Sequence, residues 1–329
     1  MTVGVLGAGA WGTALAQMVA SDGSAVTLWA REAELVDEIN TSSRNSLYLP
    51  DARLAPSIRA TGDLSAMARC DTLLVVTPAQ HTGAVLDAMP GLPRDLVLCS
   101  KGIEAGTGRL MNDVARDVAP GSQIAVLSGP TFAHEVAAGL PAAVTLACGG
   151  GDEQWQRIKP HVARKAFRPY YSNDVVGAEI GGAVKNVLAI ACGVVDGLRL
   201  GQNARAALIA RGYAEMLRFG EAKGARAETL TGLCGLGDLV LTCSSTSSRN
   251  FSLGKALGEG KRAADLMADR RTVAEGAHTA PVLSSLAQRH GIAMPIVAAV
   301  DALLQGGDPR AIVQGLLARP LRAEQEAAD

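Results

Sequence analysis

The segment VGVLGAGAWGTALA, residues 3–16, decides the expected fold. Four apolar residues typical of a short buried strand lead into Gly7, Gly9 and Gly12 in the pattern GxGxxG, and an apolar helical pattern follows. A glycine motif between a strand and a helix is typical of a dinucleotide-binding unit. Gly7 permits the tight turn, Gly9 lets the backbone approach a pyrophosphate, and Gly12 lets the helix pack close to the strand. The alternative is a glycine turn without a ligand.

The end of the second expected strand, residues 25–29, bears on the choice of cofactor. An acidic residue at this point holds the ribose hydroxyls of NAD, whereas an arginine accommodates the additional phosphate of NADP. Arg31 precedes Glu32 here, and a guanidinium suits a phosphate, so we expect NADPH to be preferred while NADH is allowed. The alternative is a surface arginine without a role.

Strand and helix patterns alternate through the first half, with further strands expected at 72–76, 96–100, 124–127, 143–148 and 168–171. This alternation predicts an α/β fold, a doubly wound Rossmann-type sheet that is mainly parallel and has helices on both faces. After Tyr171 only helical patterns continue. We therefore expect a dinucleotide-binding domain over residues 1–173 and an all-helical substrate and catalytic domain over 174–329.

Residues that follow the expected strands matter because ligands bind at the carboxyl edge of parallel sheets. Lys101 comes directly after strand 96–100, and Gly129 and Thr131 follow strand 124–127. The backbone around Gly129 can present N–H groups to a ligand rich in oxygen. Each feature alone is ordinary loop chemistry, but together with the glycine loop they outline one cleft.

Residues 176–197, VGAEIGGAVKNVLAIACGVVDG, are expected to form one long helix with a single lysine, Lys185. Each glycine inside a helix costs about 1 kcal/mol relative to alanine, so the cluster indicates close approach of a backbone or a ligand. A lysine held partly out of water loses proton affinity, and we hypothesise that Lys185 carries the proton chemistry. The alternative is a packed helix whose lysine extends its ammonium to water. At 3.6 residues per turn, Lys185 shares a face with Ala178, Gly181, Gly182, Ala189, Cys192, Gly193 and Asp196.

Two loops of the second half carry polar groups. The segment TGLCGLGD, residues 231–238, either places the carboxylate of Asp238 or uses it to cap a helix. The segment SSTSSRN, residues 244–250, precedes a helical run and supplies hydroxyls, Arg249 and Asn250. It suits a phosphate monoester, because helix N-termini and arginine forks bind anions. A solvated serine-rich linker with a helix cap is the alternative.

Composition excludes several classes of function. Lys+Arg 31 against Asp+Glu 32 gives a net charge of −1, so we expect neither a nucleic-acid partner nor an anionic membrane surface. The six cysteines show no metal-ligand spacing and read as reduced, mostly buried thiols of a cytoplasmic protein without a metal site. Residue 1 leads straight into a strand without a signal peptide, and Glu179 and Lys185 interrupt helix 176–197, so we expect no membrane insertion.

Six motifs in one order carry a resemblance. GAGAWGTALA (7–16), SKGIE (100–104), SGPTFAHEVAAGLP (128–141), GGAVKNVLAIACGVVDGL (181–198), GLGDLVLTC (235–243) and SRN (248–250) are similar to those of bacterial NAD(P)-dependent sn-glycerol-3-phosphate dehydrogenases. The similarity runs from residue 3 to about residue 315. It is far more specific than the glycine loop alone.

The resemblance implies reversible reduction of dihydroxyacetone phosphate by NAD(P)H to the glycerol phosphate used in phospholipid synthesis, with Lys185 as proton donor or acceptor. It implies substrate contacts at Lys101, Gly129, Thr131, Lys185, Asp238, Ser248, Arg249 and Asn250. It implies cofactor contacts, beside Gly7, Gly9 and Gly12, at Trp11, Arg31, Lys101, Ala133, Arg249, Val273 and Glu275. Ala277 and His278 depart from the bulkier or basic residues frequent in the family.

Two other functions stay open on the residues alone. One is a related lysine-dependent hydroxyacid dehydrogenase, for which we expect GxxxKxxxN, whereas the asparagine here is Asn186 and position 189 is alanine. The other is a catalytically silent NADPH-binding sensor, which needs neither a lysine on a cleared helix face nor an anion site. The helical second half also suggests a homodimer, because pairing is the commonest assembly.

Overall fold

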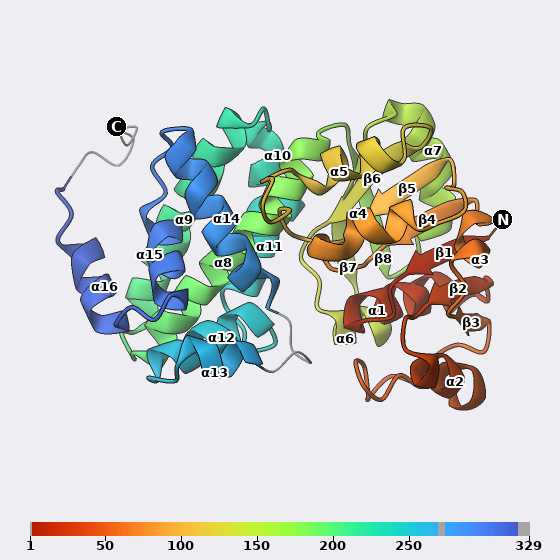
Figure 1. Ribbon diagram of the computed structural model, residues 1–329, viewed down its shortest axis with the longest axis horizontal. Helices are drawn as coiled ribbons and strands as arrows, with labels where there is room; N and C mark the ends of the chain where they lie inside the picture. The colour runs from red at the N-terminus through yellow and green to blue at the C-terminus, as the bar shows by residue number, and fades with distance from the viewer. Residues whose placement is uncertain (1, 269–273, 322–329) are drawn as a thin grey trace. The chain divides into compact units, whose positions relative to one another are not determined.

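The computed structural model describes residues 2–268 and 274–321, and the chain divides into two compact units (Figure 1). Unit 1 comprises Met1–Lys101 and Arg109–Glu179, and unit 2 comprises Gly102–Gly108 and Ile180–Asp329. The chain therefore passes from one unit to the other three times, and the segment between Lys101 and Arg109 belongs with the second half of the sequence.

Unit 1 is built on one eight-stranded sheet in the order β3-β2-β1-β4-β5-β6-β7-β8. All neighbouring strands pair in parallel except β6 and β7, which are antiparallel. The order through β6 is that of the doubly wound dinucleotide-binding fold, so the expected fold class is confirmed. The strands are β1 (Val3–Leu6), β2 (Val26–Trp29), β3 (Ile58–Thr61), β4 (Thr72–Val75), β5 (Asp95–Leu98), β6 (Gln123–Ser128), β7 (Ala142–Cys148) and β8 (Phe167–Ser172).

Strand order in unit 1 reverses direction at β1, with β2 and β3 on one side and β4 to β6 on the other. Right-handed crossovers then place α1 and the pair α4 and α5 on opposite faces of the sheet. The sequence pattern missed β3, because this four-residue edge strand buries only Ile58 and Ala60. The helices of unit 1 are α1 (Ala10–Val19), η1 (Ala20–Asp22), α2 (Ala33–Ser42), α3 (Leu64–Ala68), α4 (Ala79–Asp87), α5 (Met111–Val118), α6 (Ala133–Ala137), α7 (Gly151–Val162) and the first turn of α8 (Val175–Gly197).

The described part of unit 2 contains helices only. Its core is α8, which is long and apolar enough to cross a membrane by composition, but 94% of its most apolar window is buried inside the structure. The helix begins at Val175, one residue before the expected start at Val176, and ends at Gly197 as expected. The other helices are α9 (Gln202–Ala222), α10 (Ala227–Thr231), the π-helical turn η2 (Leu233–Gly237), α11 (Asp238–Thr242), α12 (Arg249–Gly258), α13 (Ala263–Ala268), α14 (Glu275–Arg289), α15 (Pro295–Leu304) and α16 (Pro309–Leu317).

Glycines let α8 and α12 touch backbone to backbone. A Cβ atom at Gly193 or Gly197 of α8 would overlap backbone atoms of α12. In return, a Cβ atom at Gly254 or Gly258 of α12 would overlap backbone atoms of α8. Both helices therefore use glycines four residues apart at one crossing, and Gly181 accommodates the backbone of η2 in the same way. The small residues of α8 thus make room for neighbouring backbone at these positions.

Candidate active site

The glycine loop of unit 1 has the geometry of a tight strand-to-helix turn. Gly7 has a φ of +119°, a conformation that residues with a side chain rarely adopt. A Cβ atom at Gly12 would overlap the carbonyl oxygen of Gly7, so glycine here lets α1 pack against the loop. Gly9 is the N-cap of α1, and no atom lies within 4 Å of the place its Cβ would take. The loop therefore leaves room for a pyrophosphate beside the first turn of α1, where anions bind well.

Two side chains near this loop were predicted to bind the cofactor. The indole Nε1 of Trp11 is buried and has no hydrogen-bond partner among the described residues. A buried donor of this kind is costly unless a ligand or a water satisfies it, so Trp11 fits a bound cofactor. Arg31 is exposed over 78% of its side chain and pairs with Glu32 at 3.0 Å. Exposed ion pairs contribute little stability, so this guanidinium can turn to another anion at low cost.

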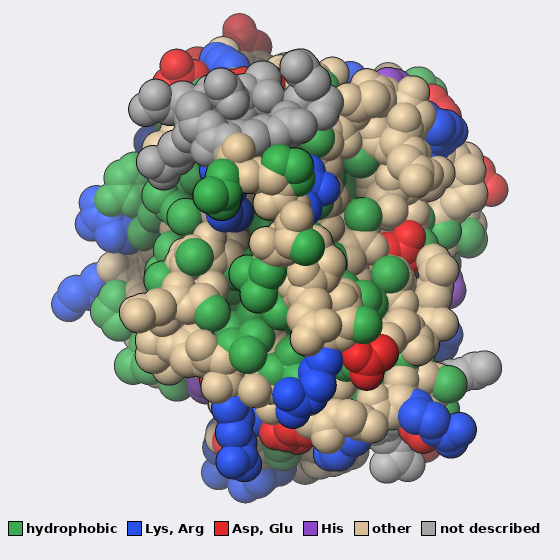
Figure 2. Space-filling view, turned by 90° about the vertical axis from the view of Figure 1, so that its left-hand side faces the viewer, with side chains coloured by type: hydrophobic (Ala, Val, Ile, Leu, Met, Phe, Trp, Pro, Cys, Tyr) green, Lys and Arg blue, Asp and Glu red, His purple; other side chains and the backbone are tan. Residues whose placement is uncertain are grey.

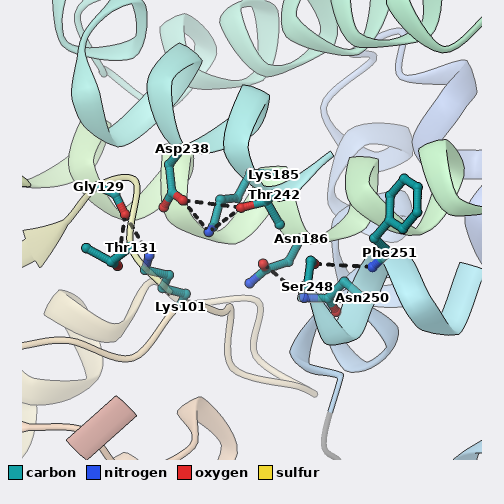
Figure 3. Close-up of polar contacts among 10 residues, drawn as sticks. All are labelled: Lys101, Gly129, Thr131, Lys185, Asn186, Asp238, Thr242, Ser248, Asn250 and Phe251. Atoms are coloured by element: carbon teal, nitrogen blue, oxygen red, sulfur yellow. Dashed lines mark hydrogen bonds and ion pairs between the residues drawn. The ribbon is translucent and has the colours of Figure 1, made fainter. Parts of the chain in front are cut away.

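The residues that follow β5 and β6 gather around one carbonyl oxygen of unit 1 (Figure 3). Lys101 Nζ donates to the carbonyl oxygen of Gly129 at 3.3 Å, and Thr131 Oγ1 donates to the same oxygen at 3.2 Å. Glycine is needed at position 129, because a Cβ atom would lie 2.8 Å from the Cα atom of Val144. Ala133 is the first residue of α6. The structure thus brings together Lys101, Gly129 and Thr131, as the strand order predicts.

Lys185 lies in the buried interior of unit 2, with only 5% of its surface exposed. Its Nζ atom donates to Asp238 Oδ1 at 2.6 Å and to Thr242 Oγ1 at 2.8 Å, and Thr242 Oγ1 donates to Asp238 Oδ1 at 3.2 Å (Figure 3). The alternative of an ammonium extended to water is therefore wrong. Separating the two charges would leave each of them buried and unpaired, which is strongly unfavourable. The ion pair therefore holds both side chains in place.

The π-helical turn η2 places Asp238 opposite Lys185. Gly235 has no space for a side chain, because its Cβ atom would overlap the backbone of Leu230. The turn leads directly into α11, of which Asp238 is the first residue and Thr242 the last. Asp238 and Thr242 thus lie one helical turn apart on the same face of α11. Sequence reasoning predicted Asp238 and missed Thr242, although the spacing of four residues was a usable signal.

The serine-rich segment serves partly as a helix cap. Ser248 Oγ accepts a hydrogen bond from the N–H of Phe251 at 3.2 Å, at the start of α12, and this side chain is buried. Asn250 is also buried, and its Nδ2 donates to Asn186 Oδ1 at 3.0 Å (Figure 3). Of the triplet 248–250, only Arg249 is exposed. The capping alternative therefore holds for Ser248, and Asn186 is a further polar neighbour that sequence reasoning missed.

The last predicted cofactor residues lie around the start of α14. Glu275 is its first residue and is partly exposed. Val273 lies outside the described residues. Within the described ranges, no group of three or more His, Cys, Asp or Glu side chains is placed to hold a metal ion. The six cysteines form no disulfide in this part of the chain, and all are buried.

Family models cover both halves of this arrangement. The model described as the NAD-dependent glycerol-3-phosphate dehydrogenase N-terminus matches residues 2–154, and the model of the corresponding C-terminus matches residues 174–314. The chain belongs to this family. Within the glycerol-3-phosphate dehydrogenase family it is similar to proteins named glycerol-3-phosphate dehydrogenase [NAD(P)+]. The relative from Erythrobacter litoralis is 74% identical, covering 99% of this chain and 98% of the relative, and that from Novosphingobium aromaticivorans is 71% identical, covering 98% of each.

A solved glycerol-3-phosphate dehydrogenase shares the fold over the whole length. The crystal structure from Coxiella burnetii has a TM-score of 0.91 and 40% sequence identity, covering 97% of this chain and 99% of that one. The family assignment from the six sequence motifs is therefore confirmed, as is the class of NAD(P)-dependent dehydrogenase. Both family models that match the chain describe a glycerol-3-phosphate dehydrogenase and not a hydroxyacid dehydrogenase.

Proposed function

We propose that this chain reversibly reduces dihydroxyacetone phosphate to sn-glycerol 3-phosphate, with Lys185 as proton donor and acceptor. The activity follows from membership of the glycerol-3-phosphate dehydrogenase family. The observation that supports the role of Lys185 is its burial beside Asp238 and Thr242, which hold the ammonium in a fixed direction. A fixed donor of this kind is what general acid catalysis requires.

The chemistry is a two-part reduction of a ketone. When bound, the reduced nicotinamide supplies a hydride to the carbonyl carbon of the substrate. The Lys185 ammonium stabilises the negative charge that develops on the carbonyl oxygen and gives that oxygen a proton, which completes the alcohol. Asp238 and Thr242 orient the ammonium before and after the transfer. In the reverse direction the neutral amine takes the proton back.

Phosphate recognition in unit 2 is proposed for the start of α12. The Arg249 guanidinium is exposed at the first position of this helix, where N–H groups and a positive charge favour an anion. Ser248 caps the same helix and holds Arg249 at its start. We propose substrate contacts at Lys101, Gly129, Thr131, Lys185, Asp238, Ser248, Arg249 and Asn250, and cofactor contacts at Gly7, Gly9, Trp11, Gly12, Arg31, Lys101, Ala133, Arg249, Val273 and Glu275.

The direct test follows the absorbance of NADPH after addition of dihydroxyacetone phosphate, with 2-oxo acids and other phosphorylated carbonyl compounds as a panel. We expect rapid oxidation of NADPH with dihydroxyacetone phosphate alone. Turnover of a 2-oxo acid instead would identify a hydroxyacid dehydrogenase. NADPH binding without turnover of any compound would identify a sensor, and either result would contradict the proposal.

Arg31 should set the preference for NADPH over NADH. Its exposed side chain follows β2, where the additional phosphate of NADP is bound in this fold. Arg31→Ala should raise the KM for NADPH about 10- to 100-fold, since a hydrogen bond to a charged group contributes roughly 1.5–3 kcal/mol. The KM for NADH should change by less than about 2-fold. Steady-state kinetics with both cofactors checks this prediction. An equal change in both KM values would show that Arg31 does not bind the additional phosphate of NADPH.

We also propose that the protein works as a homodimer. Helix α16 buries none of its residues within the described chain, and Leu317 on this helix is 80% exposed. Figure 2 shows the side of the molecule that carries α16, where hydrophobic side chains gather. Large apolar areas on a surface usually mark an interface. Light scattering should give about twice the chain mass of 33.8 kDa, and a value near 33.8 kDa would refute the dimer.

The proposed compartment is the cytoplasm, and the proposed use of the product is glycerophospholipid synthesis. Buried cysteines that form no disulfide in the described chain suit a reducing compartment. Depletion of the protein in its host should stop phospholipid synthesis, and added glycerol 3-phosphate should restore it. Unchanged lipid synthesis after depletion would contradict this use.

A further inference from the structure

Three residues with proposed functions each stand directly before a residue that takes part in one buried hydrogen-bond chain. The three functional residues stand on different helices of unit 2, and the hydrogen-bond chain joins those helices. The neighbouring pairs are Lys185 and Asn186 on α8, Arg249 and Asn250 on α12, and Glu275 and Gly276 on α14.

The side-chain amide of Asn250 joins the other two members (Figure 3 shows its contact with Asn186). Its Nδ2 donates to Asn186 Oδ1 at 3.0 Å, and its Oδ1 accepts from the backbone N–H of Gly276 at 2.9 Å. Both bonds are buried, so the amide can take only one orientation without leaving a polar atom unsatisfied. The second bond also caps α14, because Ala274 at the N-cap position has no side-chain acceptor.

At Gly276, α14 lies directly against the backbone of α8. A Cβ atom at this position would lie 2.5 Å from the carbonyl oxygen of Asn186 and 2.8 Å from Asn250 Oδ1, whereas ordinary contact begins at 3.4 Å. The first of these atoms belongs to the backbone and the second to an amide fixed by two hydrogen bonds, so neither can turn aside. Any side chain at position 276 therefore pushes the start of α14 away from the middle of α8 by roughly 1 Å.

We propose that the chain Asn186–Asn250–Gly276 is a positioning device, which fixes the starts of α12 and α14 against the middle of α8. It thereby sets the distances among Lys185, Arg249 and Glu275. The proposal rests on the proposed function and assigns Asn250 a role beyond a substrate contact: its amide oxygen and one of its N–H groups hold protein atoms. Asn186 and Gly276 act through their neighbours in sequence.

Gly276→Ala tests the device. Alanine is intrinsically the better helix residue, so any loss comes from packing and not from helix propensity. A displacement of about 1 Å between groups that align a substrate can cost about 100-fold in rate, so we expect kcat to fall about 10- to 100-fold. The KM for dihydroxyacetone phosphate should rise much less than kcat falls, because Arg249 itself is intact.

Ser285→Ala is the matched control. Ser285 lies on the same helix as Gly276, α14, and is exposed, so this change also introduces alanine into α14 but away from α8. This variant should keep the wild-type kcat and KM. Thermal unfolding of both variants shows whether they are folded at the assay temperature. If Gly276→Ala does not fold, Asn186→Ala replaces it: alanine removes the acceptor of Asn250 Nδ2, and kcat should again fall more than the KM for dihydroxyacetone phosphate rises.

A double mutant separates one device from two independent effects. If Asn250 and Gly276 act together, Asn250→Ala combined with Gly276→Ala should be about as slow as the slower single variant. If the reductions in kcat of the two single variants multiply in the double variant, the positioning device is wrong. A normal kcat in folded Gly276→Ala would also overturn it, and in both cases the proposed function would stand. A wild-type protein without turnover of dihydroxyacetone phosphate would overturn both.

Discussion

Lys185→Ala should lower kcat by about 10³-fold or more, the largest effect that we expect of any single change. The buried ammonium of Lys185 is the proposed source of the proton and of the charge that stabilises the developing alkoxide. Alanine supplies neither. The glycine loop around Gly9 belongs to unit 1 and is unchanged, so NADPH should still bind. Single-turnover oxidation of NADPH, together with a fluorescence titration of NADPH binding, measures both effects.

Loss of Lys185 also leaves the carboxylate of Asp238 buried without its ion-pair partner, which can cost about 3–5 kcal/mol of stability. Lys185→Arg keeps a positive charge in the site but holds its proton permanently, so it should fold and still lose most of the activity. Lys261→Ala, at an exposed lysine of unit 2, is the control and should be fully active. Near-normal turnover in either Lys185 variant would rule out its proton role.

Glu179→Gln should make the protein more stable than the wild type in alkaline solution. Burial raises the pKa of Glu179 from an ordinary value of 4.5 to about 8, while the N–H of Asn112 and the charge of Arg116 oppose the shift and Asp113 adds to it. Glu179 Oε1 accepts from the N–H of Asn112 at 2.7 Å. Its Oε2 and the Oδ1 of Asn112 are buried without partners in the described part of the chain.

The neutral acid is favoured because a proton on Glu179 removes a charge that is buried away from water. Because the folded pKa lies above the unfolded one, the stabilisation is complete below about pH 4.5 and is lost as the pH rises through about 8. Glutamine carries the same donor and acceptor at every pH. We expect its advantage over the wild type to grow across that interval to the order of a few kcal/mol.

Chemical denaturation at a series of pH values checks this prediction. Glu221→Gln, at an exposed glutamate of α9, is the control and should follow the wild-type curve. Burial also raises the pKa of Glu215, to about 7. Glu215 therefore contributes equally to the pH dependence of the unfolding free energy in all three proteins, and its contribution cancels when they are compared. A constant difference between Glu179→Gln and the wild type across the pH range would show that Glu179 is ionised in the folded protein.

The sequence predicted local features of the fold well, because they are encoded locally. The glycine loop and the alternation of strands and helices gave the sheet and its carboxyl edge. Strand β3 was not predicted, because two buried residues, Ile58 and Ala60, are too few to form a recognisable strand pattern. The glycines of α8 predicted a close approach, but only the folded chain shows that Gly254 and Gly258 of α12 fill that role.

The sequence predicted individual residues of the candidate site but not which of their side chains contact one another. Lys185 and Asp238 were identified separately, and their ion pair depends on how η2 folds back on α8. Thr242 and Asn186 were missed for the same reason: each acquires its meaning from a residue distant in sequence. Local patterns specify which side chains are available, whereas tertiary packing selects the ones that meet.

The division of the chain between its two units affects when each segment can fold during synthesis. Residues Gly102–Gly108 emerge from the ribosome with the first half, yet they pack with the second, where Ile103 is fully buried and Gly108 lies near Leu286. This short segment therefore stays without its final neighbours until α14 has been translated. Cutting the gene after the sheet would leave Ile103 exposed to solvent, so a fragment intended to represent the nucleotide-binding half should replace this segment with a polar turn.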